Sequence, residues 1–442
     1  MGLRVNKHIL IVGGGYVGLY TALGLQRRLS RELRDGEVSI TIIDPQSYMT
    51  YQPFLPEAAA GNLSPRHVVA PLRRILPKVR ILNGLVTRID HAGRSVTFQP
   101  AEGERREIAY DVIVMAAGSI SRTLPIPGLT DIGIGFKTVS EAIALRNRVL
   151  HLLDVAESTD DPELRRRVLT FVVVGAGFAG VEALAELEDM AKDSTRYYRN
   201  ITASDLRWVL VEATERVLPE VGPEMGQWTL EQLRERGIEV KLGTRLESCE
   251  GGHVVLSDGS RFEAETLVWT AGVKPSPVVN DSDLPLDERG RLKTTTTLAL
   301  AGIRDAFAAG DAAGVPDVTN PGQYCAPNAQ HAVRQAKVLA DNIVRHLRGQ
   351  ELVEYRHKYV GSVAGLGLYQ GVANVYGIKL RGFPAWFMHR TYHLSRVPTL
   401  NRKVRVVVDW TLALFFKRET ISLGEMEHPR EGFRAAVATM RR

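Results

Sequence analysis

Cysteine is scarce in this sequence, with only Cys249 and Cys325 among 442 residues. The two form neither a C-x-x-C nor a C-x-x-x-x-C pair, which excludes a disulfide framework and a redox dithiol. A lone cysteine such as Cys325 is more often a small packed residue than a reactive one. The chain therefore fits a protein of the reducing cytosol.

Long apolar runs are also missing. No stretch reaches the roughly 18 apolar residues that a membrane-spanning helix needs, and the best candidate, Val406 to Phe416, is interrupted by Asp409. The apolar run from His8 to Val12 is short for a signal peptide and leads directly into a glycine-rich turn. We therefore expect neither a membrane span nor a signal peptide.

Charge is spread unevenly along the chain. The net charge is +6, but residues 356–442 hold 15 Lys and Arg against 5 Asp and Glu, a net +10, which leaves −4 for the rest. The length and the 44% hydrophobic content indicate a globular protein of about three domains. No recognisable nucleic-acid-binding fold accompanies the basic tail, so we expect no nucleic-acid partner.

Two copies of one glycine pattern are the most informative feature that is present. Each reads G-x-G-x-x-G, follows a run of β-branched and aliphatic residues, and opens a helix-forming stretch. The first glycine permits a tight turn, the second lets the backbone approach a pyrophosphate, and the third lets the helix pack on the strand. The pattern glycines are Gly13, Gly15 and Gly18 in one copy and Gly175, Gly177 and Gly180 in the other. Two copies predict two dinucleotide sites, between which electrons would pass.

Three further predicted strands end in an acid or in a small-residue turn. The second predicted strand of the first copy ends at Asp44, where a carboxylate can accept hydrogen bonds from both ribose hydroxyls of an adenosine. Two later predicted strands end in the small-residue turns Ala117-Gly118 and Gly310-Asp311. The Gly-Asp pair could also be no more than a turn.

The second copy has matching features. Its second predicted strand ends at Glu212, a carboxylate that would repel a 2′-phosphate and accept from a 2′-hydroxyl, which favours NADH over NADPH. Arg216 could accommodate a 2′-phosphate, so the strictness of this preference stays open. A strand over 266–269 leads to a turn that holds Gly272. Glu182, in the first helical turn, could face the nicotinamide or only stabilise the helix dipole.

Four segments are similar to motifs of one known family. Residues 51–61 read YQPFLPEAAAG, similar to a Q-P-L-L-x-E-x-A-x-G loop, and residues 177–187 match G-x-x-G-V-E-x-x-x-E-L. Residues 327–332 resemble an A-Q-x-A-x-Q motif, and the tail holds GFPAW and VDW segments. These motifs occur in the same order in the type II NADH:quinone oxidoreductases, which are single-chain, non-proton-pumping flavoproteins. The chain resembles this family essentially from end to end.

This resemblance implies a fold and two cofactors. The implied fold is α/β, with two Rossmann-like dinucleotide-binding domains like those of glutathione reductase. The implied cofactor is FAD and the implied reductant is NADH, whose hydride passes to the flavin before two electrons go to a membrane quinone. The resemblance places Asp311 on the flavin ribityl or pyrophosphate, Pro53 beside the flavin, and Ala329 with Gln330 between flavin and quinone. Neither a metal nor a protein nucleophile is needed.

The implied catalytic residues are Glu182, Gln330 and Arg334. Arg334 departs from the family, whose second motif glutamine falls at this position, although Gln335 follows directly. The arginine could bond a quinone carbonyl or cap an exposed helix face. The quinone type and the proton donor to the quinol stay open, with His331 as a further candidate donor because its ordinary pKa lies near neutrality.

The tail combines aromatic and basic residues between Leu380 and Phe416. Amphipathic stretches of this composition suit the lipid headgroup boundary, where cations meet anionic lipid. The expectation is a peripheral, monotopic protein on the cytoplasmic face of the cell membrane, and the resemblance adds a homodimer. The aromatic residues could instead pack against the flavin domain or a dimer partner.

The predicted domain limits follow from these motifs. They are an FAD-binding domain at 1–124 and 288–355, an NADH-binding domain at 165–287, and a basic amphipathic region at 356–442. Two other functions share both glycine patterns: a soluble reductase of a small electron-carrier protein, which needs no amphipathic tail, and a flavin-binding sensor without turnover.

Overall fold

The computed structural model describes residues 6–357 and 360–422, so residues 423–442 of the predicted tail region lie outside the described part. The chain forms two compact units. The first comprises Met1–Thr50, Val69–Ile120 and Val273–Tyr359, and the second comprises Tyr51–Val68, Ser121–Gly272 and Val360–Arg442. Residues 51–68 and the tail thus group with the predicted NADH-binding segment. Which nucleotide each predicted domain binds stays a prediction.

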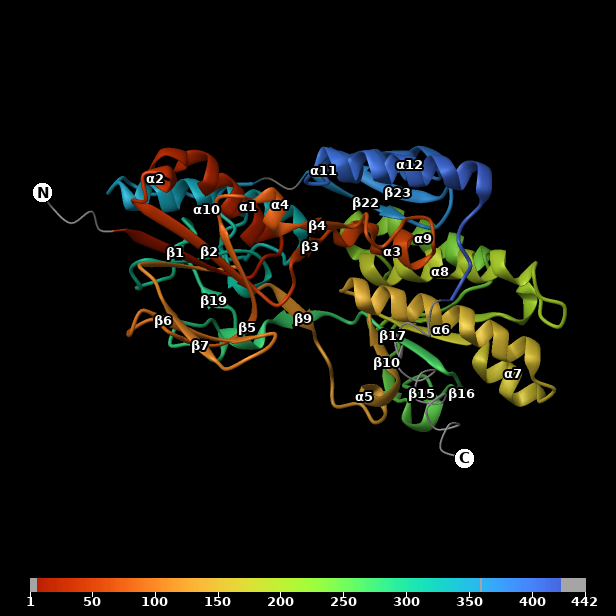
Figure 1. Ribbon diagram of the computed structural model, residues 1–442. Helices are drawn as coiled ribbons and strands as arrows, with labels where there is room; N and C mark the ends of the chain where they lie inside the picture. The colour runs from red at the N-terminus through yellow and green to blue at the C-terminus, as the bar shows by residue number, and fades with distance from the viewer. Residues whose placement is uncertain (1–5, 358–359, 423–442) are drawn as a thin grey trace, which may run out of the picture. The chain divides into compact units, whose positions relative to one another are not determined.

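The first unit is built on a seven-stranded sheet (Figure 1). Its first five strands are parallel and its last two are antiparallel additions. Strand β1 is buried from Ile9 to Val12, which explains the apolar run of these four residues. In spatial order the strands are β20 (Ala306–Ala308), β8 (Val112–Met115), β1 (Lys7–Val12), β2 (Val38–Asp44), β5 (Arg80–Asp90), β6 (Ser95–Pro100) and β7 (Arg106–Ala109).

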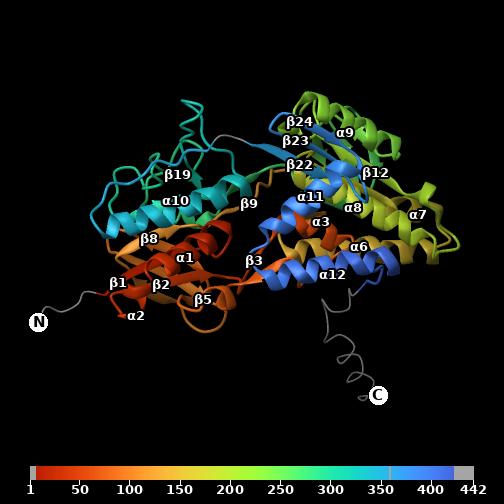
Figure 2. The ribbon, with the colours of Figure 1, turned by 90° about the horizontal axis from the view of Figure 1, so that it is seen from above.

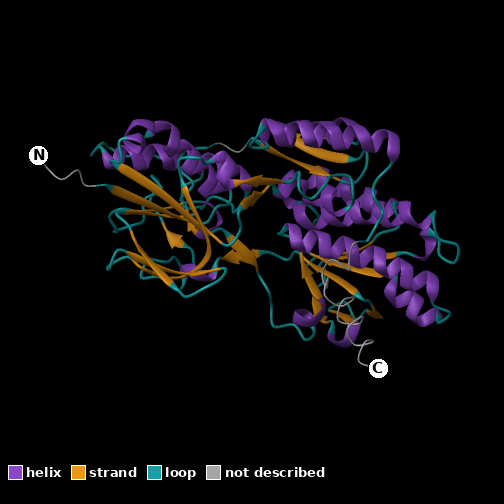
Figure 3. Ribbon diagram, viewed as in Figure 1, coloured by secondary structure: helices purple, strands orange, loops and turns teal. Residues whose placement is uncertain are grey.

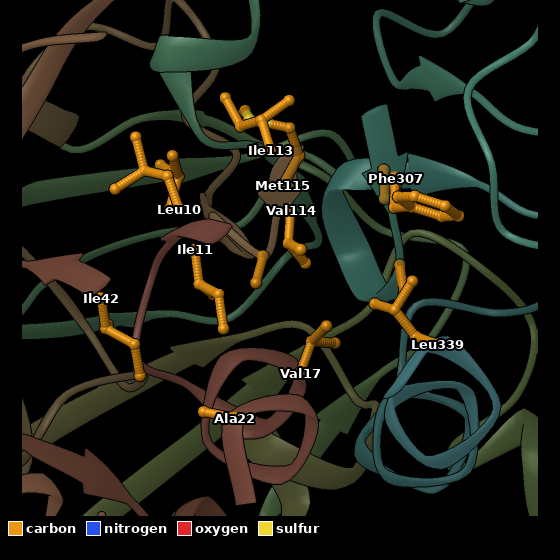
Figure 4. Packing of buried hydrophobic residues seen from close by; sticks show 14 of the residues in the cluster. Leu10, Ile11, Val17, Ala22, Ile42, Ile113, Val114, Met115, Phe307 and Leu339 are labelled. Carbon is orange, nitrogen blue, oxygen red and sulfur yellow. The ribbon is translucent and has the colours of Figure 1, made fainter. Parts of the chain in front are cut away.

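Two helices, α1 (Tyr16–Arg28) and α10 (Ala329–Leu347), lie side by side over one face of this sheet (Figures 1 and 2). Figure 4 shows the core between these two helices and the sheet, where Val17 of α1 and Leu339 of α10 point toward the strands. Helix α1 ends at Arg28, and the backbone of the next residue, Leu29, leaves the helical region while its side chain is buried. The smaller elements are α2 (Ser30–Arg34), β3 (Tyr48–Thr50), β4 (Val69–Pro71), α4 (Leu72–Ile75), β9 (Ser119–Ser121), β18 (Val273–Pro275), β19 (Leu292–Lys293), η6 (Gly310–Ala312) and β21 (Ala313–Gly314).

The second unit holds a five-stranded parallel sheet with the long helices α6 (Val139–Ser158) and α8 (Phe178–Thr195) (Figures 1 and 3). The order of its strands is β10 (Gly133–Gly135), β17 (Thr266–Trp269), β11 (Thr170–Val174), β12 (Arg207–Val211) and β13 (Glu239–Lys241). A three-stranded antiparallel sheet follows, with β14 (Leu246–Ser248), β15 (His253–Leu256) and β16 (Arg261–Glu263). The last two pair as a hairpin, with Ser257, Asp258 and Gly259 in the turn between them. The short helices α5 (Leu129–Ile132) and α7 (Pro162–Val168) complete this part.

The C-terminal segment adds a second antiparallel sheet and two helices to the second unit. The sheet is β22 (Gly361–Gly365), β23 (Gly371–Val375) and β24 (Ile378–Arg381), and the helices are α11 (Phe383–Arg396) and α12 (Leu400–Phe416). One side of the sheet packs on α11, while α8 and α9 (Pro223–Glu235) contact it as well. The short helix α3 (Leu55–Ala59) packs against α6 and α8. Among the helices of the described residues, none is long and apolar enough to cross a membrane.

Candidate functional site

The two glycine patterns fold into the same local structure, one in each unit. The first glycine of each pattern has a positive φ, +103° at Gly13 and +107° at Gly175, which an L side chain rarely adopts. The third glycine packs the helix against the turn. A Cβ on Gly18 or Gly180 would lie 1.9 Å from the carbonyl oxygen of the first glycine of its own pattern. The geometry therefore requires glycine at both positions.

The second glycine of each pattern has a different environment. A Cβ on Gly15 or Gly177 would meet no atom of the described chain within 4 Å, and both residues have ordinary negative φ angles. Each is the N-cap of its helix, α1 or α8, and neither helix has a side-chain cap within the described residues. Backbone amides at such a helix start attract a phosphate. Both turns therefore fit the pyrophosphate of a dinucleotide.

An acid at the end of the second strand completes each turn in the same way. Asp44 Oδ2 accepts from the amide of Gly14 at 2.6 Å, and Glu212 Oε2 accepts from the amide of Ala176 at 2.7 Å. The other carboxylate oxygen accepts from the amide two residues on, at Gln46 or Thr214. Burial raises the pKa of Asp44, although these amides oppose the shift. The carboxylates lie where a ribose would be recognised.

The remaining predicted flavin turns meet at one edge of the first sheet. Strands β2, β1, β8 and β20 are adjacent and parallel, so Asp44, the glycine turn, Gly118 and Asp311 all follow carboxyl ends at this edge. Asp311 Oδ2 accepts a 2.6 Å hydrogen bond from Ser119 Oγ, which joins the last two turns directly. A Cβ on Gly118 would meet no described atom within 4 Å. In the second unit, Gly272 follows β17 beside the turn of β11 and has the same open surroundings.

The start of α10 carries the predicted quinone motif. Ala329 and Gln330 begin the helix behind the N-cap Asn328, whose side chain accepts from the amide of His331 at 2.8 Å. Gln335, and not Arg334, contacts the Gly-Asp turn, because its Oε1 accepts from the amide of Gly310 at 2.8 Å.

Arg334 turns back along its own helix. Its Nη1 donates to the carbonyl oxygen of Gln330 at 3.0 Å. His331 is buried and bonds Tyr355 Oη at 2.9 Å, and burial lowers its pKa. This lowered pKa disfavours the imidazolium that a histidine proton donor would need near neutrality.

Glu182 and Pro53 belong to the second unit and line a small buried pocket there. Its volume of about 10 Å³ is roughly that of one water probe. Glu182 Oε1 accepts from the amide of Gly365 at 2.9 Å and lies 3.0 Å from Nε2 of His389, which has no aligned hydrogen-bond partner among the described residues. Burial raises the pKa of Glu182 to about 8 and lowers that of His389 to about 3, so the neutral pair is favoured.

Glu57, a buried acid of the 51–61 motif, holds the tail helices in place. Glu57 Oε2 accepts from Arg390 Nη2 of α11 at 2.8 Å and from Trp410 Nε1 of α12 at 2.6 Å. The Arg390 guanidinium lies over the rings of Trp386 and Trp410, 4.2 and 4.8 Å from their centroids. Asp409, also on α12, accepts from the amide of Ser64 at 3.0 Å. Polar contacts therefore hold both helices on the 51–68 segment.

Comparison with known proteins decides the family. The pyridine nucleotide-disulphide oxidoreductase family matches residues 7–336. The type II NADH:quinone oxidoreductase Ndh of Mycobacterium tuberculosis is 30% identical over 428 residues, which cover 93% of this chain and 89% of that protein. The type II NADH:quinone oxidoreductase of Staphylococcus aureus is 32% identical over 392 residues, covering 87% and 94%. The chain belongs to the type II NADH:quinone oxidoreductases.

A solved structure shares the fold of this type II oxidoreductase. The structure of NDH2 from Plasmodium falciparum in complex with NADH has a TM-score of 0.86 at 18% identity, covering 94% of this chain and all of that one. The family resemblance and the α/β dinucleotide-binding fold are thus confirmed. The individual site residues stay predictions.

Several residues of this type II oxidoreductase that shape the site were missed from sequence. Ser119 follows directly after the Ala117-Gly118 turn, so polarity next to a small-residue turn was its available signal. Gln335 was named only as the glutamine after Arg334, and its contact with the Gly-Asp turn was not predicted. Glu57 was part of a quoted motif, but nothing local indicated its partners on the tail helices. His357, which contacts Gln330, has no sequence signal at all.

Proposed function

We propose that this chain oxidises NADH, holds FAD, and passes two electrons to a quinone without pumping protons. Each unit holds a glycine cradle, by which we mean the turn of its glycine pattern, Gly13–Gly18 or Gly175–Gly180. The observation that carries the proposal is this pair of equivalent cradles, together with membership of the type II family. A single cradle would serve many dehydrogenases. Two cradles in one chain fit a protein that receives hydride from one dinucleotide on another.

The residues of the first unit fit FAD. The open position at Gly15, the carboxylate of Asp44 and the joined turns of Ser119 and Asp311 offer contacts for a pyrophosphate, a ribose and a ribityl chain. Ala117 and Gly118 would line the same edge. When bound, FAD supplies the redox chemistry by accepting a hydride from NADH and giving two electrons to the quinone. The protein holds these groups and excludes water.

The residues of the second unit fit NADH. Two backbone amides hold the Glu212 carboxylate at the end of β12, where it can accept from a 2′-hydroxyl and repels a 2′-phosphate. Arg216 is exposed on the following loop. We infer a preference for NADH over NADPH on these contacts.

The acceptor is a membrane quinone, and Gln330 at the start of α10 is the residue we assign to it. Arg334, which stands where the family has a glutamine, adds a positive charge one helical turn away and bonds the Gln330 carbonyl. We therefore assign Gln330 to direct contact and Arg334 to the charge around it. Of the candidates to supply a proton, Glu182 has a pKa raised to about 8, which keeps its carboxyl protonated at neutral pH.

We further propose that the protein binds the cytoplasmic face of the cell membrane through α11 and α12. Along α12, exposed apolar side chains recur at helical spacing, and Phe415 and Phe416 are 76% and 77% exposed. Arg405 and Lys417 are exposed beside them and would meet anionic lipid. Trp386, by contrast, is buried against Arg390 and anchors α11 to the unit rather than to lipid. A homodimer, implied by the family resemblance, is testable by analytical ultracentrifugation.

The test of the electron path is double-mixing stopped flow. NADH first reduces the flavin, seen as bleaching near 450 nm by the usual flavin chromophore, and a short-chain quinone or a ferredoxin is then added. Recovery of absorbance with quinone alone supports the proposal. Recovery with ferredoxin alone would favour a soluble reductase, and no bleaching at all would favour a flavin-binding sensor.

The test of membrane binding uses surface variants. Replacing Val404, Leu412 and Phe415 by serine removes exposed apolar surface without touching the contacts of Glu57. We expect co-sedimentation with anionic vesicles to fall at least tenfold, in line with the apolar area lost. Tyr197→Ser is the matched control, since Tyr197 is 63% exposed elsewhere on the same unit. Equal binding by all three proteins would refute the assignment.

A further inference from the structure

The chain after α10 folds back along that helix and brings His357 to its N-terminal end. Asn342 on α10 pairs with the backbone of Val353 through two hydrogen bonds of 2.8 and 2.9 Å. Tyr355 donates its amide to the carbonyl of Thr296 at 2.7 Å, and its buried hydroxyl meets His331. These four bonds fix the path of the backbone up to His357.

The side chain of His357 contacts the residue that we assign to the quinone. Its Nε2 lies 3.1 Å from Oε1 of Gln330. Its ring also lies edge-on to that of His331, 5.7 Å between centroids. A glutamine side chain ends in two groups of similar shape, an oxygen that accepts and an NH₂ group that donates. The contact with His357 distinguishes the oxygen end from the nitrogen end.

The atom of Gln330 that His357 meets decides the direction of this hydrogen bond. Burial, with the nearby positive charge of Arg334, lowers the pKa of His357 to about 4, so the imidazole is neutral near pH 7. An amide oxygen only accepts, so the neutral ring must carry its proton on Nε2 and donate it to Gln330. The NH₂ group of Gln330 then points away from His357.

We propose that His357 is a positioning residue for quinone reduction, which orients Gln330 so that its amide N–H donates to a quinone carbonyl. This inference rests on the proposed function. A quinone carbonyl oxygen gains negative charge as electrons arrive, so a donor aimed at it stabilises the transition state. The reversed amide would present an oxygen and repel the same charge. His357 thus selects the productive face of Gln330.

The test compares two substitutions at one position. His357→Leu removes the donor, whereas the amide nitrogen of His357→Gln can replace Nε2. We expect His357→Leu to lower kcat/KM for a short-chain quinone about tenfold, mainly through KM, and His357→Gln to stay within about threefold of wild type. The rate of flavin reduction by NADH, measured in the absence of quinone, should not change in either variant, because the NADH cradle lies in the other unit.

A double-mutant cycle shows whether His357 acts through Gln330. In a Gln330→Leu background, adding His357→Leu should cause no further loss, because there is no amide left to orient. Full additivity of the two losses would overturn the inference, as would a wild-type quinone KM for His357→Leu. If His357→Leu does not fold, His357→Asn, which is too short to reach Gln330, takes its place with the same expectations.

The proposed function and this inference fail in different ways. Wild-type protein whose reduced flavin is not reoxidised by any quinone refutes the proposed function. Wild-type protein that is reoxidised, with His357→Leu reoxidised equally well at every quinone concentration, refutes only the role of His357.

Discussion

Alanine at the second glycine of each pattern separates dinucleotide binding from folding. An added Cβ at Gly15 or Gly177 meets no described protein atom within 4 Å, and the backbone there suits any L residue. The protein should therefore fold normally with alanine at either position. A pyrophosphate lying against that backbone would, however, collide with the new methyl group.

The expected loss follows from the cost of overpacking a close contact, about 1–3 kcal/mol, or about 5- to 150-fold in a binding constant. Gly177→Ala should raise the NADH concentration that gives half-maximal flavin bleaching by this factor, with normal flavin content. Gly15→Ala should lose FAD on dialysis, measured as the ratio of flavin to protein absorbance. Gly177→Ala should not lose FAD, and Gly15→Ala that retains FAD should show the wild-type dependence on NADH concentration.

The third glycines provide the matched control. A Cβ on Gly180 would lie 1.9 Å from a backbone oxygen and cannot be accommodated without movement of the turn. Gly180→Ala should therefore destabilise the fold by about 1–3 kcal/mol or more, seen as a lower melting temperature. An unchanged NADH dependence in Gly177→Ala, with the fold intact, would refute the reasoning that a pyrophosphate occupies this cradle.

Three further predictions concern charged groups of the second unit. Glu57→Leu should lower the free energy of unfolding by about 3–5 kcal/mol because it leaves buried Arg390 unpaired, and Glu57→Leu with Arg390→Met should recover most of this loss; denaturant titration measures both, and equal stability of the single and double variants would contradict the pairing. Glu212→Ser should lower the preference for NADH over NADPH about tenfold in steady-state kcat/KM, since it removes the repulsion of a 2′-phosphate, and an unchanged ratio would point to another determinant. Glu182 has a pKa raised from 4.5 to about 8, so the folded state binds the extra proton and its stability falls as pH rises. Between pH 6.5 and pH 9 the wild type should lose about 2 kcal/mol relative to Glu182→Gln, and parallel stability curves for the two proteins would contradict the shift.

The dinucleotide turns could be predicted from sequence because their requirements are local. A positive φ and a 1.9 Å approach of backbone each demand glycine within a few residues of a buried strand, and both occur at Gly13 and Gly18. The order of parallel strands then carries Asp44 and Asp311 to the same sheet edge. Spacing therefore predicted the glycine turns and Asp44, whereas the family resemblance supplied Asp311; their contacts with a dinucleotide stay predictions.

The buried polar contacts could not be predicted because their partners are distant in sequence. Glu57 meets Arg390 and Trp410 only after the tail helices dock on the 51–68 segment. Glu182 was predicted to face the nicotinamide or to stabilise its helix, whereas its carboxylate contacts Gly365 and His389 of the C-terminal segment. Its part in the redox reaction stays a prediction.

The tail shows the same limit. Composition indicated an amphipathic region but could not tell which aromatic side chains face inward. Trp386 is buried while Phe387, one residue on, is 57% exposed, because only one side of α11 packs on β22 and β23. Helical spacing limits which side chains can lie on the same side of α11, but the packing of the helix on the sheet determines which side is buried.

The most direct test of the electron path is an anaerobic titration of the purified full-length protein. One equivalent of NADH should bleach the flavin completely, and one equivalent of short-chain quinone should then restore its absorbance, since each transfer carries two electrons. Bleaching by NADH that no quinone reverses would contradict the account, whatever the two glycine cradles hold.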